Sequence, residues 1–381
     1  MNFLKILSLM LSVVFVMVTL PVRPVGAIAP EELSAPAAVL MDAETGTVLF
    51  EKNSHEVRAC ASITKVMTLI LVMEALDSGK IQWEDTVTAS AHAASMGGSD
   101  IWLEPGETMS VEEMVKATIV ASANDAAVAL AELVSGTEED FVRAMNEKAK
   151  ELHMKETVFK NCNGLDEEGH VTSAYDVAVM SAELLRHPKI LQYSGIWMDE
   201  LRGGKTQLVN TNKLLKSYPG ITGLKTGTTS KAGSCISATA DRDGLRLIAV
   251  VLGSSTGKER FSDAAKLLDY GYANYTMLLP EVPPEVFRDI PVKNGMTSSV
   301  ATTCQITDKL LAGKGRGKSM EPEIYLPETV EAPIEKGEII GKLIYKSGGK
   351  QIAEYPIAAE ASVEAINFND VMGLFLRSMA G

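Results

Sequence analysis

Apolar and polar positions follow two different patterns along the chain, and the pattern changes near residue 280. Before that point, apolar stretches with helical spacing alternate with short runs typical of strands. After it, short β-like runs follow one another, at 286–292, 298–306, 323–326, 339–345 and 351–357. The pattern predicts a domain of mixed helices and strands over 28–279 and a small all-β domain over 280–360. Pro280, Pro283 and Pro284 mark the linker between them.

Within the first domain, the same pattern predicts the order of the helices and strands. A hairpin is expected at 38–42 and 47–51, with Gly46 in its turn, and a helix from Ser62 towards Gly79. Residues 80–100 are polar and irregular, which predicts a surface excursion. Ser110 and Glu113 form a capping box that opens a helix towards Ala121. Further expected elements are a helix at 125–134, helices at 137–154 and 172–186, strands at 234–240 and 245–253, and a helix at 258–275.

The two ends of the chain have their own patterns. Lys5, the apolar run 6–20 and the small residues 25–27 are typical of a secretory signal peptide cut after Ala27, so we expect an exported, extracytoplasmic protein. An uncleaved anchor is the alternative, but the run is short for a membrane span. Residues 361–381 form an amphipathic helix, capped by Asn369 or Asp370. Its apolar face lies flat on a membrane or packs on a protein partner; both interpretations stay open. That face holds Val371, Met372, Phe375, Leu376 and Met379.

The net charge of the chain makes nucleic acid and anionic lipid unfavourable binding partners. The formal net charge is −13. Residues 1–27 carry two bases and no acids, so the chain after residue 27 stands at −15. An acidic exported protein is a poor candidate for nucleic acid, and anionic headgroups would repel it. The four cysteines are irregularly spaced in a chain large enough for a real core, so we expect small buried thiols rather than disulfides. No spacing fits a metal site, and none is expected.

Candidate chemistry begins at the start of the helix that follows the hairpin. Ser62-Ile63-Thr64-Lys65 places a hydroxyl and an amine on one helical face, a turn apart. A lysine can take the proton of a serine hydroxyl only if its pKa falls well below about 10.4. Taken alone, Ser62 reads as an ordinary helix cap, and Ser-x-x-Lys recurs at 255–258 and 347–350 in turn-like segments.

Two further polar elements change that interpretation. Ser122-Ala123-Asn124 interrupts a helical stretch, and Lys225-Thr226-Gly227 lies in a glycine-flanked strand beside a hairpin. Either could be structural by itself. The three elements together, in this order and behind a signal peptide, match the signature of penicillin-binding proteins and class A β-lactamases.

The chain closely resembles the low-molecular-mass penicillin-binding proteins that are D-alanyl-D-alanine carboxypeptidases. Further matching stretches are 223–227, 231–233 and 173–176. The resemblance covers nearly everything after the signal peptide. It implies an α+β fold, an antiparallel sheet with helices on both faces that includes the N-terminal hairpin, followed by the small β-domain.

The resemblance also implies roles for single residues. Ser62 would be the acylated nucleophile and Lys65 its base. Ser122 would relay a proton to the leaving group and Asn124 would hold the substrate amide. The remaining implied roles complete the site: Lys225 keeps Lys65 near neutrality and attracts the substrate carboxylate, Thr226 and Arg260 bind that carboxylate with Gly227 beside them, and the N–H groups of Ser62 and Thr228 form the oxyanion hole.

The implied reaction removes the terminal D-alanine from a peptidoglycan stem peptide ending in D-Ala-D-Ala, without a cofactor, and β-lactams acylate the same serine. A serine β-lactamase is the nearer rival, but class A enzymes use a Glu-x-x-x-Asn element, and none lies between Asn124 and Lys225. The second alternative is a catalytically silent wall-binding scaffold. It would be expected to lack a motif residue, and none is missing.

Overall fold

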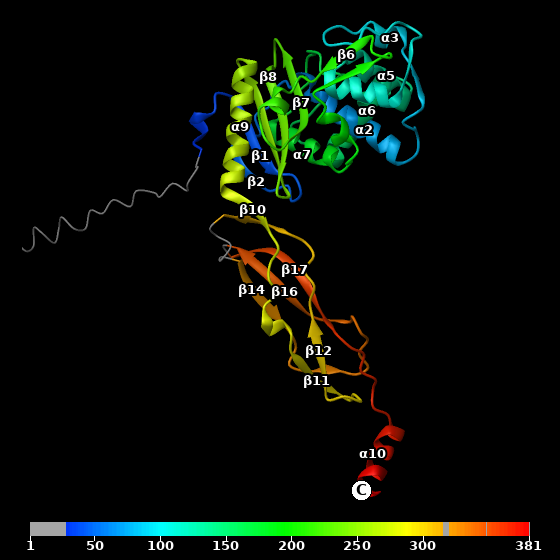
Figure 1. The fold of residues 1–381 in the computed structure, drawn as a ribbon, viewed down its shortest axis with the longest axis vertical. Helices are drawn as coiled ribbons and strands as arrows, with labels where there is room; N and C mark the ends of the chain where they lie inside the picture. The colour runs from blue at the N-terminus through cyan, green and yellow to red at the C-terminus, as the bar shows by residue number, and fades with distance from the viewer. Residues whose placement is uncertain (1–27, 315–319, 348, 381) are drawn as a thin grey trace, which may run out of the picture. The chain divides into compact units, whose positions relative to one another are not determined.

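Figure 1 shows the computed structural model, which describes residues 28–314, 320–347 and 349–380. The signal peptide expected at 1–27 lies outside the described residues. The chain forms two compact units. The first contains the described residues up to Asp241 together with Arg246–Asn274, and the second contains Arg242–Leu245 and the chain from Tyr275 onwards. The sequence predicts the boundary after residue 279; in the structure it lies five residues earlier, because Tyr275–Leu278 pairs with a strand of the second unit.

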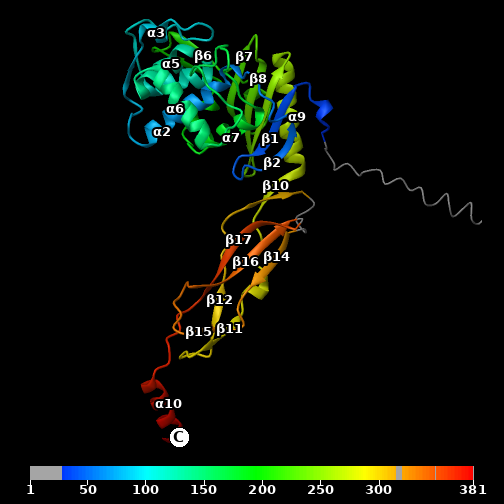
Figure 2. The same ribbon diagram turned by 180° about the vertical axis from the view of Figure 1, so that it is seen from behind.

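A five-stranded antiparallel sheet forms the first unit's centre, in the order β2-β1-β9-β8-β7. The N-terminal hairpin is part of it, as the resemblance implied. The sheet's inner strands are buried because helices cover both faces: α9 lies on one face and α7 on the other (Figures 1 and 2). β7 is an edge strand, so one of its sides has no neighbouring strand in the sheet. The bounds are β1 Ala37–Asp42, β2 Val48–Lys52, β7 Ile221–Thr229, β8 Gly233–Arg242, β9 Leu245–Ser254, α7 Ala174–Leu185 and α9 Gly257–Asn274.

The remaining helices build a second layer beside the sheet. α2 and α5 are buried on nearly all sides, which is typical of helices at the centre of a core. The capping box at Ser110 and Glu113 is present as predicted. The bounds are η1 Pro30–Glu32, η2 Ala61–Thr64, α2 Lys65–Asp77, α3 Ala91–Ala94, α4 Val111–Lys116, the π-helical η3 Ala117–Ala121, α5 Asn124–Ser135, α6 Glu138–Glu151, α8 Ile190–Ser194 and η4 Lys213–Lys216.

Two small sheets were not predicted. β3 (Thr86–Thr88) pairs with β4 (Thr108–Ser110), and β5 (Met198–Leu201) pairs with β6 (Thr206–Val209). The expectation that 80–100 is a surface excursion is therefore wrong for part of this segment, since its apolar side chains join the core. The buried ones are Ile81, Val87, Ala89 and Ala93.

The second unit is built from strands, as predicted. A six-stranded sheet has the order β14-β16-β17-β12-β11-β15, and β10 pairs with β13. Leu343 and Ile357 lie in one of its small cores, and Ile290 and Val300 in another. The bounds are β10 Tyr275–Leu278, η5 Pro284–Val286, β11 Asp289–Lys293, β12 Ser299–Thr303, β13 Leu310–Gly313, β14 Met320–Tyr325, β15 Val330–Glu331, β16 Ile339–Ser347 and β17 Lys350–Ala359.

The chain ends in helix α10, Phe368–Ala380. The expected cap at Asn369 or Asp370 is wrong: the side chain of Asn367 accepts the N–H of Asn369, so the helix starts earlier. Within the described residues, no helix combines the length and the apolar character needed to cross a bilayer. The prediction of free thiols is confirmed, because all four cysteines are buried and unpaired.

Candidate active site

The nucleophile candidate lies on a tight turn in front of helix α2. The 3₁₀ turn Ala61–Thr64 precedes the helix, and Ala61 has the left-handed backbone angle φ 51°. Gly227 of β7 packs directly against this turn. A Cβ at residue 227 would lie 2.7 Å from the carbonyl oxygen of Cys60 and 2.8 Å from the nitrogen of Ser62. Only glycine therefore lets the edge strand approach the backbone of Ser62 so closely.

Lys65 is fully buried, and its amine has three partners. Nζ lies 3.2 Å from Ser62 Oγ, 2.5 Å from Asn124 Oδ1 and 2.6 Å from the carbonyl oxygen of Asn163. Burial lowers the pKa of Lys65 to about 7. A neutral amine has two N–H groups and one lone pair. The amide and carbonyl oxygens can only accept, so they take the two N–H groups, and the lone pair is left for the hydroxyl of Ser62.

Ser122 and Lys225 form a second pair beside the first. Ser122 ends the π-helical turn in a left-handed conformation, φ 65°, and Asn124 then begins α5. The amine of Lys225 donates to Ser122 Oγ at 2.8 Å and to the carbonyl oxygen of Thr226 at 2.9 Å. Burial lowers the pKa of Lys225 well below its ordinary value, and the nearby charge of Lys65 lowers it further.

This electrostatic arrangement refines the role implied for Lys225. We had expected Lys225 to be the reason that Lys65 is close to neutrality. Burial is instead the largest cause for both amines. The charge of Lys65 lowers the pKa of Lys225 further, whereas the charges that act on Lys65, from Cys162 and Asp125, raise its pKa and oppose burial.

The edge strand carries the remaining predicted residues. Thr226 Oγ1 donates to Thr211 Oγ1 at 2.7 Å. The guanidinium of Arg260, from the first turn of α9, donates through Nη1 to the carbonyl oxygen of Gly227 at 2.9 Å and to Thr228 Oγ1 at 2.8 Å. Thr228 is exposed. Arg260 thus touches the strand at Gly227 and Thr228, and its Nε is buried without a protein partner in the described part of the chain.

The structure brings the predicted residues into one constellation, and it adds one that sequence reasoning missed. The carbonyl of Asn163 holds Lys65, and this residue belongs to none of the three sequence motifs. Gly164 was a usable signal: it has φ 88°, and a Cβ there would collide with the carbonyl group of Ala61. A glycine of this kind in a polar loop indicates close packing against another backbone.

His170, in the same loop, has a structural role. Its Nδ1 accepts the N–H of Lys160 at 3.1 Å, so its Nε2 carries the proton and donates to Thr64 Oγ1 at 2.7 Å. Burial lowers the pKa of His170 to about 4, which keeps the ring neutral.

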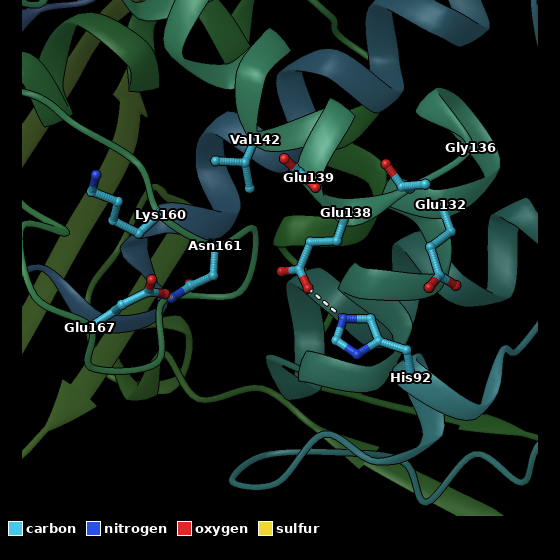
Figure 3. Close-up of a pocket in the computed structure, with 10 residues that line it drawn as sticks. His92, Glu132, Gly136, Glu138, Glu139, Val142, Lys160, Asn161 and Glu167 are labelled. Carbon is cyan, nitrogen blue, oxygen red and sulfur yellow. Dashed lines mark hydrogen bonds and ion pairs between the residues drawn. The ribbon is translucent and has the colours of Figure 1, made fainter.

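A separate cavity of about 470 Å³ is lined by none of the predicted site residues. Figure 3 shows His92 pointing at Glu138, and their atoms Nε2 and Oε2 are 2.7 Å apart. The other oxygen of Glu138 accepts the N–H of Cys162 at 3.1 Å. This cavity wall therefore supports the peptide unit next to Asn163.

Comparisons with known proteins identify the family of this chain. The D-alanyl-D-alanine carboxypeptidase family model matches residues 25–256, and the model of the penicillin-binding protein 5 C-terminal domain matches 284–365. The D-alanyl-D-alanine carboxypeptidase DacF of Bacillus subtilis (strain 168) is 46% identical over 338 residues, which are 88% of this chain and 87% of the relative.

Solved structures of penicillin-binding proteins are also similar to this chain. Penicillin-binding protein 5 from Haemophilus influenzae aligns with a TM-score of 0.73 and 31% identity, over 89% of this chain and 100% of that one. Penicillin-binding protein D2 from Listeria monocytogenes, in its ampicillin-bound form, aligns with a TM-score of 0.56 and 36% identity, over 63% of this chain and 98% of that one. Because the first family model alone spans more than half of the sequence, the chain belongs to the D-alanyl-D-alanine carboxypeptidase family, in the form that ends with a penicillin-binding protein 5 C-terminal domain.

Proposed function

We propose that this D-alanyl-D-alanine carboxypeptidase works through an acyl-enzyme on Ser62, with Lys65 as the general base. The observation that carries the proposal is the environment of the Lys65 amine. Two atoms that can only accept hydrogen bonds occupy its N–H groups, and burial lowers its pKa to about 7. The lone pair therefore faces Ser62 Oγ, 3.2 Å away, as proton abstraction requires.

Acylation then proceeds in two proton transfers. Ser62 Oγ attacks the carbonyl carbon of the penultimate D-alanine while its proton passes to Lys65. The N–H groups of Ser62 and Thr228 receive the developing oxyanion. The peptide C–N bond breaks, and the proton that Lys65 accepted passes through Ser122 to the nitrogen of the departing D-alanine, which leaves Lys65 neutral again. Lys225 contacts Ser122 at 2.8 Å. Water then attacks the Ser62 ester, releases the shortened peptide and restores the hydroxyl.

The terminal carboxylate of the substrate is bound by the edge strand and its neighbours. Lys225, Thr226 and Arg260 are the proposed contacts, with Gly227 as the close-packed backbone between them. The low pKa of Lys225 in the free site is compatible with this role. An arriving carboxylate favours the charged form of the amine, so binding and protonation of Lys225 support each other.

β-Lactams are proposed to acylate Ser62 in the same way, because they present a reactive amide next to a carboxylate. The Listeria relative in its ampicillin-bound form supports this by similarity. Asn124 is proposed to hold the amide of either ligand. Its Nδ2 now donates to the carbonyl oxygen of Gly97 at 2.6 Å, so that contact competes with a ligand for the same group.

The protein is proposed to act outside the cytoplasm, after removal of residues 1–27. Helix α10 is proposed to hold it at the outer face of the cytoplasmic membrane. The support is the apolar surface of the helix: Phe368, Leu376 and Met379 are 75%, 58% and 71% exposed. A helix of this length lies flat in the interface rather than spanning it.

The deciding experiment is the intact mass of the mature protein after incubation with penicillin, followed by peptide mapping. We expect a stable adduct on Ser62, no adduct in the Ser62→Ala variant, and D-alanine release from a stem-peptide analogue by the wild-type protein alone. Rapid loss of the adduct with turnover of the drug would indicate a β-lactamase. Folded protein that forms no adduct would favour the silent scaffold.

A further inference from the structure

Trp102 is a large aromatic side chain held in solvent by a rigid backbone. It is 77% exposed, while its neighbours Ile101 and Leu103 are 1% and 4% exposed. Its own backbone is left-handed, φ 53°, which is costly for a bulky residue. A protein surface does not ordinarily combine a strained backbone with a solvated indole ring, and such residues concentrate at ligand-binding sites.

The backbone on both sides of Trp102 is fixed by buried charge. The carboxylate of Asp125, 1% exposed, accepts the N–H of Ile101 at 3.0 Å and that of Leu103 at 3.0 Å. Arg202 donates through Nη1 to the carbonyl oxygen of Ile101 at 2.9 Å. Arg202 is itself held by Glu107, 2.6 Å from its Nε. The ring is thus presented by a built scaffold and not by a loose loop.

This scaffold is continuous with the active site. The N–H of Asn124 donates to the carbonyl oxygen of Ser99 at 2.7 Å, and Asp125 is the next residue in the chain. The link through Leu103 and Asp125 limits the distance between the Cα atoms of Trp102 and Asn124 to roughly 13 Å, from ordinary bond lengths. Trp102 is therefore close to the proposed substrate site, and Asp125, which fixes its backbone, directly follows Asn124 in the chain.

This upper limit does not exceed the length of the peptide between the two ends of the substrate. A stem peptide joins its terminal D-alanine residues to a sugar of the glycan strand through a short peptide. Four extended residues span about 13 Å. When the D-Ala-D-Ala end is in the cleft, the attached sugar can reach the indole ring without a second binding event.

We propose that Trp102 is a stacking platform for the sugar ring that carries the stem peptide. This rests on the proposed function, since the cleft must hold the peptide end. The face of an indole ring is electron-rich and attracts the C–H groups of a sugar's apolar face. Acidic neighbours, Asp100 and Glu104, make the patch unfavourable for anionic lipid. The muramyl carboxyl is consumed in the link to the peptide, so the sugar brings no opposing charge.

The test compares two substrates with the same peptide, one free of sugar and one carrying the disaccharide. Trp102→Ala is expected to lower kcat/KM for the disaccharide pentapeptide about tenfold, and that for the sugar-free peptide far less. Trp102→Phe should recover most of the loss, because a phenyl ring still stacks. An equal fall on both substrates, or no fall on either, would overturn the proposal.

Fluorescence gives a second readout that is independent of turnover. In the Ser62→Ala protein, the disaccharide pentapeptide should change the tryptophan emission, and this change should vanish when Trp102→Phe is added. Trp197→Phe is the matched control and should keep it, since the chain has three tryptophans. Penicillin acylation of the otherwise wild-type Trp102→Ala protein monitors Ser62 separately. Loss of acylation in the wild-type protein as well would contradict the proposed function, on which this inference rests. Acylation kept in both proteins, with no sugar-dependent fall in kcat/KM, would contradict this inference alone.

Discussion

At the scale of single residues, the chemistry depends on the protonation of Lys65. A lysine with its ordinary pKa would be an ammonium at neutral pH and could not accept the proton of Ser62. Burial lowers the pKa of Lys65, and the oxygens of Asn124 and Asn163 accept hydrogen bonds from its amine. The amine can therefore act as a base without a neighbouring carboxylate or histidine. In the neutral amine, the two N–H groups donate to these two oxygens, and the lone pair is left for the hydroxyl of Ser62.

The first prediction concerns the pH dependence of acylation. Burial lowers the pKa of Lys65 to about 7, so the reactive neutral amine increases as the pH rises through about 7 and is lost below it. The rate constant for penicillin acylation, measured between pH 5 and 9, should follow this rise. Lys65→Arg, which stays protonated, should slow acylation roughly a thousandfold at every pH. A rate that is flat from pH 5 to 9 in the wild-type protein would contradict this role for Lys65.

The second prediction concerns Gly227. Gly227→Ala puts a Cβ within 2.8 Å of the nitrogen of Ser62, so the strand must move away from the proposed oxyanion donors. We expect acylation to fall by about a hundredfold or more, the size of a lost oxyanion contact. Gly373→Ala is the matched control, since an added Cβ there meets no atom within 4 Å. Similar acylation rates for both variants would show that the strand tolerates the shift.

At the scale of elements, the site joins two segments that are distant in sequence. Asp166, in the loop that carries Asn163, accepts from Thr229 Oγ1 at 2.6 Å, from Ser230 Oγ at 3.1 Å and from the N–H of Lys231 at 3.2 Å. One carboxylate therefore connects the loop that holds the proposed general base, Lys65, to the turn that follows the edge strand β7.

The third prediction follows from that connection. Asp166→Ala should loosen the loop and the turn together and slow acylation about tenfold, while the exposed site limits the loss of stability to about 1 kcal/mol. Burial would raise the pKa of Asp166, but hydrogen bonds from Thr229, Lys231 and Ser230 outweigh it and lower it. The connection is therefore complete at neutral pH and weakens only in acid. Glu168→Ala, exposed in the same loop, is the control for acylation and for thermal unfolding.

How much of this was predictable depends on the range of the interactions. The hairpin expected at 38–42 and 47–51 and the capping box at Ser110 are set by local patterns, and the structure confirms them. The helix expected from Ser62 is present but begins at Lys65, because residues 61–64 form a 3₁₀ turn. The pairing of β3 with β4 joins three-residue strands across a gap of about twenty residues, too short for a periodic signal. Asn163 contacts Lys65 through its backbone carbonyl, a group that every residue has. The contact therefore cannot be predicted from the side chain at this position.

At the scale of the whole molecule, the chain combines an acidic surface with an apolar end. It carries about fifteen negative charges in excess after residue 27, while the sequence of α10 holds one acid and one base, Asp370 and Arg377. A helix of 13 residues is roughly 20 Å long, shorter than the apolar core of a bilayer. Any attachment through α10 must come from burial of its apolar side chains in the interface.

The fourth prediction is that vesicle binding depends on α10 and not on lipid charge. The mature protein should cosediment with neutral phosphatidylcholine vesicles, and removal of residues 367–381 should abolish binding while D-alanine release from a soluble peptide is kept. Val371→Glu with Leu376→Glu should act like the truncation, because charges on the apolar face oppose its burial. Ile339→Glu, at an exposed isoleucine of the β-domain, is the matched control.

Varying the charge of the lipid distinguishes attachment through the apolar face of α10 from attachment through electrostatic attraction. Anionic lipid should weaken binding, because the acidic protein is repelled, and added salt should restore it by screening that repulsion. Binding that needs anionic lipid and is lost in salt would place a basic surface at the membrane instead. If the protein carrying an intact α10 binds no vesicle at all, the exposed face of the helix is a contact for a protein partner, the other interpretation that its sequence allows.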